Sequence, residues 1–280
     1  MKNIDLKTVV GFGREWSSFD QNRLSEEDKS KIFDDYFHIF PWDKLSPSAV
    51  GADIGCGSGR WAQVVAPRVG HLHLIDASQE ALQVAKNNVS PSGNCSFHHA
   101  SVGDLPFSDN SLDFAYSLGV LHHVPETVEG ISSIAKKLKQ GSPFLVYLYY
   151  AFDNRPIWFR MMWRVSDIIR RFISCLPYIL RLVLSQLIAI LIYFPLARGA
   201  RLLDLLKVMP RSWPLGYYRD KSFYVMRTDA LDRFGTRLEQ RFSKQKIELM
   251  LKKLGFKDIY FSDKQPYWCA VGVKDKVCAE

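Results

Sequence analysis

The sequence predicts an α/β protein built on a doubly wound parallel sheet with helices on both faces. Between residues 46 and 150, short apolar runs of strand length alternate with stretches of helical periodicity. The first apolar run, 50–54, is followed at once by three glycines at alternate positions, Gly55, Gly57 and Gly59. The chain has 280 residues, of which 47% are hydrophobic and 24% charged, so it can bury a large core.

The elements can be placed in order along the chain. A helix is expected from about Ser25 to Pro41, because acidic residues suit its first turn and Pro41 ends it. Its apolar stripe is expected to face the core. Strands are predicted near 50–54, 71–75, 95–99, 112–117 and 143–149, and helices near 60–69, 78–88 and 126–139. Ser243 can cap a helix that Gly255 ends, and strands near 256–261 and 267–273 follow.

The glycine-rich segment after the first strand predicts a tight turn that leads into a helix. Glycine allows a positive φ and lets the backbone approach a ligand closely, and the N–H groups at a helix start favour a negative or polar ligand group. The dinucleotide fingerprint has its third glycine three residues after the second. Here Arg60 stands at that position, which disfavours NAD and FAD.

A second apolar run, 71–75, ends at Asp76. A carboxylate at the end of the second strand can accept hydrogen bonds from both hydroxyls of a ribose. The turn and Asp76 together therefore predict a cofactor that contains a nucleoside.

Four ordered motifs carry a resemblance to a known family. They are Asp-Ile-Gly-Cys-Gly-Ser-Gly at 53–59, Asp-Ala-Ser at 76–78, Asp-Leu-Pro-Phe at 104–107 and Ser-Leu-Gly-Val-Leu-His-His at 117–123. With them, about residues 45–150 resemble the class I S-adenosylmethionine-dependent methyltransferases, particularly the branch that methylates quinones, lipids and natural products. The resemblance implies a Rossmann-like sheet of seven strands with the last strand antiparallel, and an N-terminal helical lid over the cofactor.

The resemblance also implies which residues contact S-adenosylmethionine and its product S-adenosylhomocysteine. The acid that usually receives the adenine amino group would fall at Ser101, so the adenine is expected to be held by Ser101 and the N–H of Val102. Asp104 is a less favoured substitute. No metal is expected. The full set of expected cofactor contacts is Trp16, Asp53, Gly55, Cys56, Gly57, Asp76, Ala77, Ser78, Ser101, Val102, Ser117 and Leu118.

Methyl transfer from a sulfonium releases a neutral leaving group, so alignment and a dry pocket are its main requirements. A base helps only where the nucleophile carries a proton. His122 follows the fourth strand and is the candidate base, since imidazole titrates near neutral pH. The alternative is that His122 and His123 shape their loop and form local hydrogen bonds.

Residues 151–211 form a basic and apolar insertion, predicted to be a helical cap. Ten Lys and Arg residues stand against three Asp residues between Asp153 and Arg211. The uncharged stretch 182–197 is shorter than the roughly 20 residues of a spanning helix, and Pro177 and Pro195 are expected to interrupt it, so no transmembrane span is predicted. The cap is expected to wall off a substrate pocket and pack on the sheet or on a second copy in a homodimer. Alternatively, it rests on an anionic membrane. Nucleic-acid binding is the least favoured hypothesis.

The chain is thus divided into a lid (1–45), a cofactor-binding core (46–150), the cap (151–211) and a segment that completes the sheet (212–280). The expected function is methyl transfer to an O, N or C nucleophile of an apolar or amphipathic small molecule, for example in secondary metabolism. One alternative is a membrane-surface methyltransferase of a quinone or lipid, and another is a non-catalytic cofactor-binding or assembly protein. Five cysteines without metal or disulfide spacing, and a start without an apolar signal segment, favour a cytoplasmic location, with peripheral contact at the inner membrane face as the variant.

Overall fold

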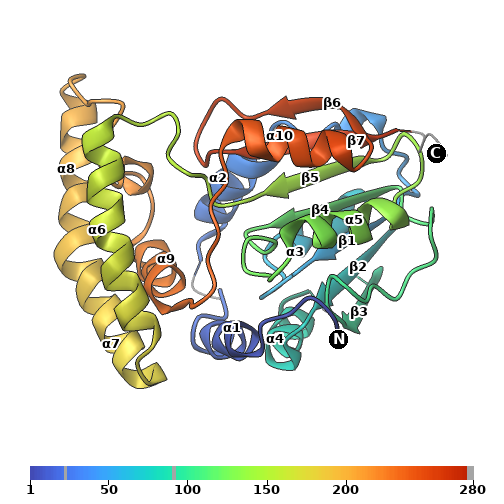
Figure 1. The fold of residues 1–280 in the computed structure, drawn as a ribbon, viewed down its shortest axis with the longest axis horizontal. Coiled ribbons are helices and arrows are strands. Elements are labelled where there is room, and N and C mark those ends of the chain that lie inside the picture. The colour runs from blue at the N-terminus through green and yellow to red at the C-terminus, as the bar shows by residue number, and fades with distance from the viewer. Residues whose placement is uncertain (22–23, 90–92, 276–280) are drawn as a thin grey trace. The chain divides into compact units, whose positions relative to one another are not determined.

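The computed structural model describes residues 1–21, 24–89 and 93–275 (Figure 1). The described residues divide into two compact units. The first contains those of Met1–Asn22, Lys29–Ala151 and Leu238–Glu280, and the second contains those of Arg23–Asp28 and Phe152–Arg237. The helical insertion therefore continues beyond the expected boundary at 211, because helix α9, Phe223–Gly235, packs against the helices before it.

The first unit is organised around a seven-stranded sheet in the order β3-β2-β1-β4-β5-β7-β6 (Figure 1). The first five strands are mutually parallel, and β7 pairs antiparallel with both β5 and β6. This arrangement confirms the predicted Rossmann-like sheet with an antiparallel last strand. The strands are β1 Val50–Ile54, β2 His71–Asp76, β3 Cys95–His99, β4 Phe114–Leu118, β5 Pro143–Tyr147, β6 Phe256–Phe261 and β7 Cys269–Lys274.

The sequence explains why β4 and β5 occupy the middle of this sheet. All five residues of β4 are buried, and so are the first four of β5, as in parallel strands covered on both faces. Between β1 and β4, the chains approach so closely that a Cβ on Gly51 would overlap the ring of Phe114. Strand order reverses where β1 lies between β2 and β4, and ligands of such sheets bind beyond the carboxyl ends of the strands at that point.

The helices of the core lie close to their predicted positions, at α4 Gln79–Val89, α5 Thr127–Lys137 and α10 Lys244–Lys253. The helix predicted over 60–69 is shorter. It consists of one turn, α3 Ala62–Val65, followed by the 3-10 turn η2 Ala66–Arg68. Pro67 has no N–H to continue α-helical hydrogen bonding, which accounts for the change.

Two helices and a short turn precede the sheet. Helix α2, Glu26–Phe37, matches the predicted helix, and the core burial of Phe33 and Phe37 confirms the interpretation of its apolar stripe. A 3-10 turn, η1 Trp42–Lys44, follows it. Helix α1, Leu6–Ser18, was not placed from the residue pattern, although the resemblance implied an N-terminal helical lid. Asp5 caps this helix by accepting a hydrogen bond from the Thr8 N–H at 2.8 Å.

The second unit is helical, with α6 Ile157–Ser174, α7 Tyr178–Ile188, the π-helical turn η4 Ala189–Tyr193, α8 Phe194–Leu205, the 3-10 turn η5 Gly216–Tyr218 and α9. The expectation that Pro195 interrupts the apolar stretch is wrong. Proline lies in the first turn of α8, directly after the π-helical turn, where its missing N–H is accommodated. The result is one continuous helix, Tyr178–Leu205, of 28 residues, and within the described residues it is long and apolar enough to cross a membrane.

Candidate functional site

The turn after β1 has the geometry that only glycine adopts easily. Gly55 and Gly57 have φ values of +79° and +53°. A Cβ on Gly55 would overlap the side chain of Val120. The N–H groups of Gly55 and Cys56 donate to the carbonyl of Ile75 at 2.8 and 2.9 Å, which ties the turn to the end of β2. The glycine turn is therefore fixed against the neighbouring strand.

Asp76 lies at the end of β2 and faces this turn. Its Oδ2 accepts a hydrogen bond from the Gly57 N–H at 2.9 Å, and its Oδ1 accepts one from the Ser78 N–H at 2.8 Å. Burial raises the pKa of Asp76, while these hydrogen bonds act in the opposite direction. The structure thus brings together the glycine turn and the carboxylate that the sequence singled out.

Helix α1 covers the turn. A Cβ on Gly57 would lie 2.9 Å from Cε2 and Nε1 of Trp16, so the indole rests directly on Gly57. The guanidinium of Arg60 lies 5.9 Å from the centroid of the Trp16 ring. Trp16, a predicted cofactor contact, therefore lies beside the glycine turn, supplied by helix α1.

Ser101, at the end of the third strand, is held by the start of the chain. Its hydroxyl donates to the carbonyl of Lys2 at 2.7 Å and accepts from the Lys2 N–H at 3.1 Å. The adjacent Val102 is buried. The expected adenine contacts of Ser101 and Val102 stay predictions.

Several predicted contacts are already bonded inside the first unit. The Tyr116 hydroxyl donates to Asp53 Oδ2 at 3.0 Å, and the Ser117 hydroxyl donates to the carbonyl of Ile54 at 2.9 Å. Burial raises the pKa of Asp53 to about 8, against the lowering effect of the Tyr116 hydrogen bond. Cys56 and Leu118 are buried beside these strand ends. These residues form the floor of the site.

The start of α4 fixes two more predicted contacts. The Ser78 hydroxyl accepts from the Ala81 N–H at 3.2 Å and donates to Glu80 Oε2 at 2.8 Å, so Ser78 caps the helix as expected. The carbonyl of Ala77 lies 3.0 Å from His99 Nε2. The Ser78 hydroxyl and the His99 ring therefore help to position the loop that carries Asp76.

One buried polar atom in the turn has no partner. Ser58, between Gly57 and Gly59, is 1% exposed, and its hydroxyl has no hydrogen-bond partner in the described part of the chain. Buried hydroxyls are normally bonded, and an exception at a glycine turn indicates a ligand group. The turn, Asp76 and Ser58 thus fit a polar, nucleoside-containing cofactor. Among the described residues, no group of three or more His, Cys, Asp or Glu is arranged to hold a metal ion.

His122 is fully buried, its Nε2 has no hydrogen-bond partner in the described part of the chain, and its role as a base stays a prediction. Its Nδ1 accepts from the Tyr149 N–H at 3.4 Å, which leaves the proton of the neutral ring on Nε2. Burial lowers the pKa of His122 well below its ordinary value, and the charges of His123 and Arg241 add to that effect. The ring stacks on Tyr149 with centroids 3.8 Å apart, so it shapes the loop.

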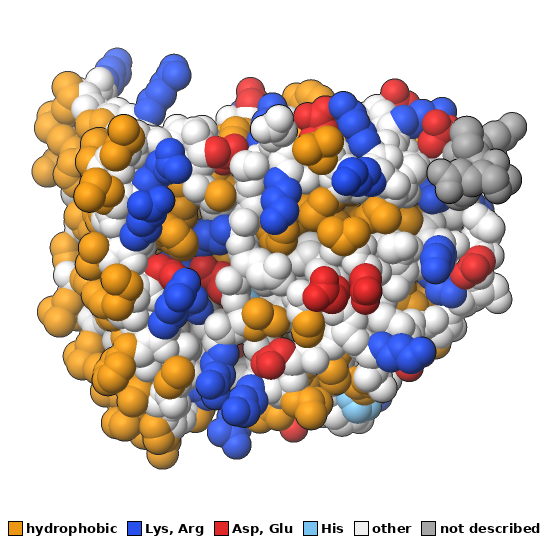
Figure 2. Space-filling model, in the orientation of Figure 1, with side chains coloured by type: hydrophobic (Ala, Val, Ile, Leu, Met, Phe, Trp, Pro, Cys, Tyr) orange, Lys and Arg blue, Asp and Glu red, His pale blue; other side chains and the backbone are white. Residues whose placement is uncertain are grey.

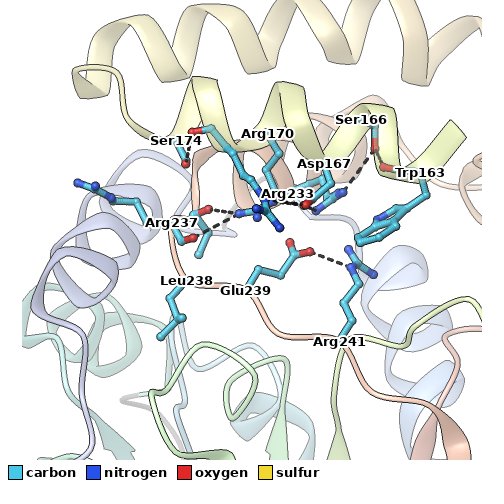
Figure 3. Close-up of polar contacts among 12 residues, drawn as sticks. Trp163, Ser166, Asp167, Arg170, Ser174, Arg233, Arg237, Leu238, Glu239 and Arg241 are labelled. Carbon is cyan, nitrogen blue, oxygen red and sulfur yellow. Dashed lines mark hydrogen bonds and ion pairs between the residues drawn. The ribbon is translucent and has the colours of Figure 1, made fainter. Parts of the chain in front are cut away.

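Aromatic side chains gather beyond the ends of β4 and β5. Tyr36 contacts Tyr147 edge-on with centroids 5.1 Å apart, and Tyr147 lies 6.0 Å from Tyr149. The Arg241 guanidinium lies 5.0 Å from the centroid of the Tyr149 ring. Arg241 Nε lies 2.8 Å from Glu239 Oε1, and Figure 3 shows this ion pair. No local sequence pattern marks Arg241 or Glu239 as site residues, because they come from a distant segment. Tyr36 was visible only as part of the apolar stripe of α2.

The second unit contains a buried charge cluster (Figure 3). Asp167 Oδ1 lies 2.7 Å from Arg170 Nε and 4.0 Å from Arg233 Nη1, and Arg170 also donates to the carbonyl of Thr236 at 2.9 Å. Burial acts to raise the pKa of Asp167, but the hydrogen bond from Arg170 and the nearby arginine charges outweigh it, so the pKa is lowered. Arg181 likewise donates to the carbonyl of Gly235 at 2.7 Å. Arg170 and Arg181 are therefore structural and do not provide the anionic-membrane contact considered from the sequence.

Comparison with known proteins agrees with this architecture. Residues 52–146 match the family model described as Methyltransferase domain. An uncharacterized methyltransferase, YcgJ, of Bacillus subtilis is 32% identical over 101 residues, which cover 35% of this chain and 40% of that protein. A 2-phytyl-1,4-naphtoquinone methyltransferase of Nostoc is 27% identical over 161 residues, which cover 55% of this chain and 66% of that protein. The chain thus spans less than two thirds of the length of these relatives.

Solved structures share the fold over almost the whole chain. The Haloferax volcanii methyltransferase in a complex with the activator Trm112 has a TM-score of 0.53 and 14% identity, covering 95% of this chain and 98% of that one. A Haemonchus contortus phosphoethanolamine N-methyltransferase has a TM-score of 0.51 and 19% identity, covering 91% of this chain and 43% of that one. Residues 52–146 therefore match a methyltransferase domain, and the chain shares the fold of these methyltransferases.

Proposed function

We propose that the protein transfers a methyl group from S-adenosylmethionine to a small molecule. The observation that carries this proposal is the glycine turn, whose Gly57 N–H meets Asp76 and whose Ser58 hydroxyl is buried without a partner. This turn belongs to the segment that matches the methyltransferase family. The same features are what an adenosyl group with an amino-acid tail requires.

The residues of the site divide the cofactor between them. Asp76 would accept hydrogen bonds from the ribose hydroxyls, and the glycine turn with Ser58 would hold the polar amino-acid part. Ser101 and the backbone of Val102 would contact the adenine. Trp16 would cover the cofactor, as its position on Gly57 supports. The bound cofactor supplies the methyl group and leaves as a neutral thioether.

Alignment of the acceptor is the main task of the protein in this reaction. Holding the acceptor in line with the methyl group can contribute about 7–11 kcal/mol. His122 would act as a positioning residue for Tyr149, because its Nδ1 is occupied and its low basicity disfavours proton uptake. A proton carried by the acceptor would leave to water or to another group.

The acceptor is proposed to be planar and apolar or amphipathic. The aromatic side chains of Tyr36, Tyr147 and Tyr149 gather beyond the ends of β4 and β5, next to the reversal of strand order. Aromatic rings recognise planar apolar groups, and Arg241 beside Tyr149 would suit a polar or anionic substituent. The naphthoquinone named for the Nostoc relative belongs to this chemical class.

The test follows transfer of label from S-adenosylmethionine labelled in its methyl group to quinone and lipid acceptors that partition into organic solvent. We expect labelled product with the wild type and loss of product with Asp76→Ala. Asp109→Ala, which removes an exposed carboxylate of the same unit, is the matched control and should leave transfer unchanged. Cofactor binding without transfer to any acceptor would favour the non-catalytic alternative.

A further inference from the structure

The second unit exposes an unusual amount of apolar surface. Of the 26 large hydrophobic side chains exposed in the described residues, 20 lie between Ile157 and Val208. Figure 2 shows these side chains gathered over α6, α7 and α8, with Lys and Arg side chains beside them. A large contiguous apolar surface of this kind is typical of a site that binds a membrane or another protein.

Helix α6 exposes a row of large apolar side chains and buries an ion pair on its opposite face. Its outer row, Ile157, Met161, Val165, Ile168 and Phe172, follows helical spacing, and each of these side chains is 60–74% exposed. Its inner face buries the ion pair of Asp167 and Arg170 together with Phe159 and Ile173. A helix that faced water would place these groups the other way round. The charges therefore stabilise the inside of the unit, and the apolar row is left for an apolar environment.

The long helix Tyr178–Leu205 repeats this pattern. Its inner positions are small or polar and buried, including Ser185, Ala189 and Ala197. Its outer positions are large and 42–73% exposed, and they are Ile179, Val183, Leu187, Leu191 and Phe194. Only 17% of its most apolar window is buried. Two neighbouring elements of the unit thus present their larger apolar side chains outward.

The charges beside this surface indicate the partner. Arg160, Arg164 and Arg171 are exposed and follow each other along one side of α6, next to its outer row. Arg201, Lys207 and Arg211 are exposed at the other end of the segment. The segment from Asp153 to Arg211 has ten basic and three acidic residues, a net charge of 10 − 3 = +7. Apolar side chains bordered by arginines are complementary to anionic lipid headgroups above acyl chains.

We propose that the outer faces of α6 and of the helix Tyr178–Leu205 dock on an anionic lipid bilayer, with the helices lying along its surface. A spanning arrangement is disfavoured because α9 packs on the inner side of the long helix through Met226 and Ala230. Helix α9 also carries charged residues, including Arg227 and Asp229, which the hydrocarbon interior of a membrane would not accommodate. This inference goes beyond the proposed reaction and does not depend on it.

The test is flotation of the full chain with vesicles of phosphatidylcholine alone and of phosphatidylcholine with 30% phosphatidylglycerol. We expect binding only to the anionic vesicles and release at high salt. R160Q/R164Q should weaken the apparent partition about thirtyfold, from two lost arginine contacts. I168Q/F172Q, which replaces two side chains that are each 69% exposed, should weaken it at least as much. L249Q/K253Q on α10 is the matched control and should bind like the wild type.

Three outcomes would overturn the proposal. They are equal binding by the wild type and both α6 variants, a lipid-free dimer that I168Q/F172Q dissociates without any vesicle binding, and protein that resists extraction from membranes by alkaline carbonate. The second would assign the face to another copy of the chain, and the third to a membrane span. S-adenosylhomocysteine affinity, measured in parallel on I168Q/F172Q, should be unchanged, so failure of docking and failure of the proposed reaction can be distinguished.

Discussion

Gly57→Ala tests whether Trp16 rests on the glycine turn. The new Cβ would lie 2.9 Å from two atoms of the indole, at a backbone φ of +53°. A left-handed conformation costs an L-residue about 1–2 kcal/mol, and an overpacked contact adds about 1–3 kcal/mol. We therefore expect a loss of about 2–5 kcal/mol in the free energy of unfolding, measured by urea denaturation followed by circular dichroism.

Two comparison variants separate the two contributions. Gly141 has a φ of +83° and nothing within 4 Å of its Cβ position, so Gly141→Ala should show only the backbone cost. In a Trp16→Ala background, Gly57→Ala should also fall to that value, which gives a coupling of about 1–3 kcal/mol between the two sites. If Gly57→Ala costs no more than Gly141→Ala and shows no coupling to Trp16, the indole does not lie on the turn.

Three further predictions concern the ionisable side chains of Asp53, His73 and Asp167. Because the pKa of Asp53 is raised to about 8, the folded protein keeps a proton that the unfolded chain releases near pH 3.8. The free energy of unfolding should therefore fall as the pH rises from about 3.8 to about 8. Asp53→Asn should remove this slope from denaturation midpoints, and an unchanged slope would contradict the assignment. Burial is the main reason why the pKa of His73 is lowered from 6.5 to about 4. The stability that this neutral side chain contributes to folding is therefore complete above about pH 6.5 and is lost as the pH falls toward 4. His73→Gln should lose less stability over that range, and equal losses would count against it. Asp167→Asn should cost about 3–5 kcal/mol by leaving Arg170 buried without a counter-charge, whereas Glu248→Gln in an exposed pair should leave the midpoint unchanged.

The features that depend on neighbouring residues could be predicted from the sequence. The strands 50–54, 95–99 and 256–261 were placed correctly because apolar runs, glycines and turns are local signals. Asp76 was found for the same reason, since it ends a strand at a recognisable distance from the glycine turn. The seven strands and the antiparallel last strand were implied by the family resemblance, and the sheet confirms both.

The features that depend on distant residues could not be predicted. Gly11 and Gly13 hide helix α1, yet a Cβ on Gly13 would overlap Ser78, so glycine is required there by a contact made across the fold. The burial of Arg170 could not be foreseen because the carbonyl that it bonds belongs to Thr236, which is distant in the sequence. Arg241 lies beside Tyr149 because the fold brings together two segments that are far apart in the sequence. The cytoplasmic location and the homodimer stay predictions, and Cys278, counted among the reduced cysteines, lies outside the described residues.

The central claim is that Asp76 and the glycine turn hold an adenosyl cofactor, and calorimetric titration of the full chain with S-adenosylhomocysteine tests it most directly. The account predicts that the wild type binds and that Asp76→Ala loses about 1.5–3 kcal/mol of binding free energy, roughly ten- to hundredfold in affinity. Equal affinity of the two proteins, or a wild type that binds NAD and not S-adenosylhomocysteine, would contradict it.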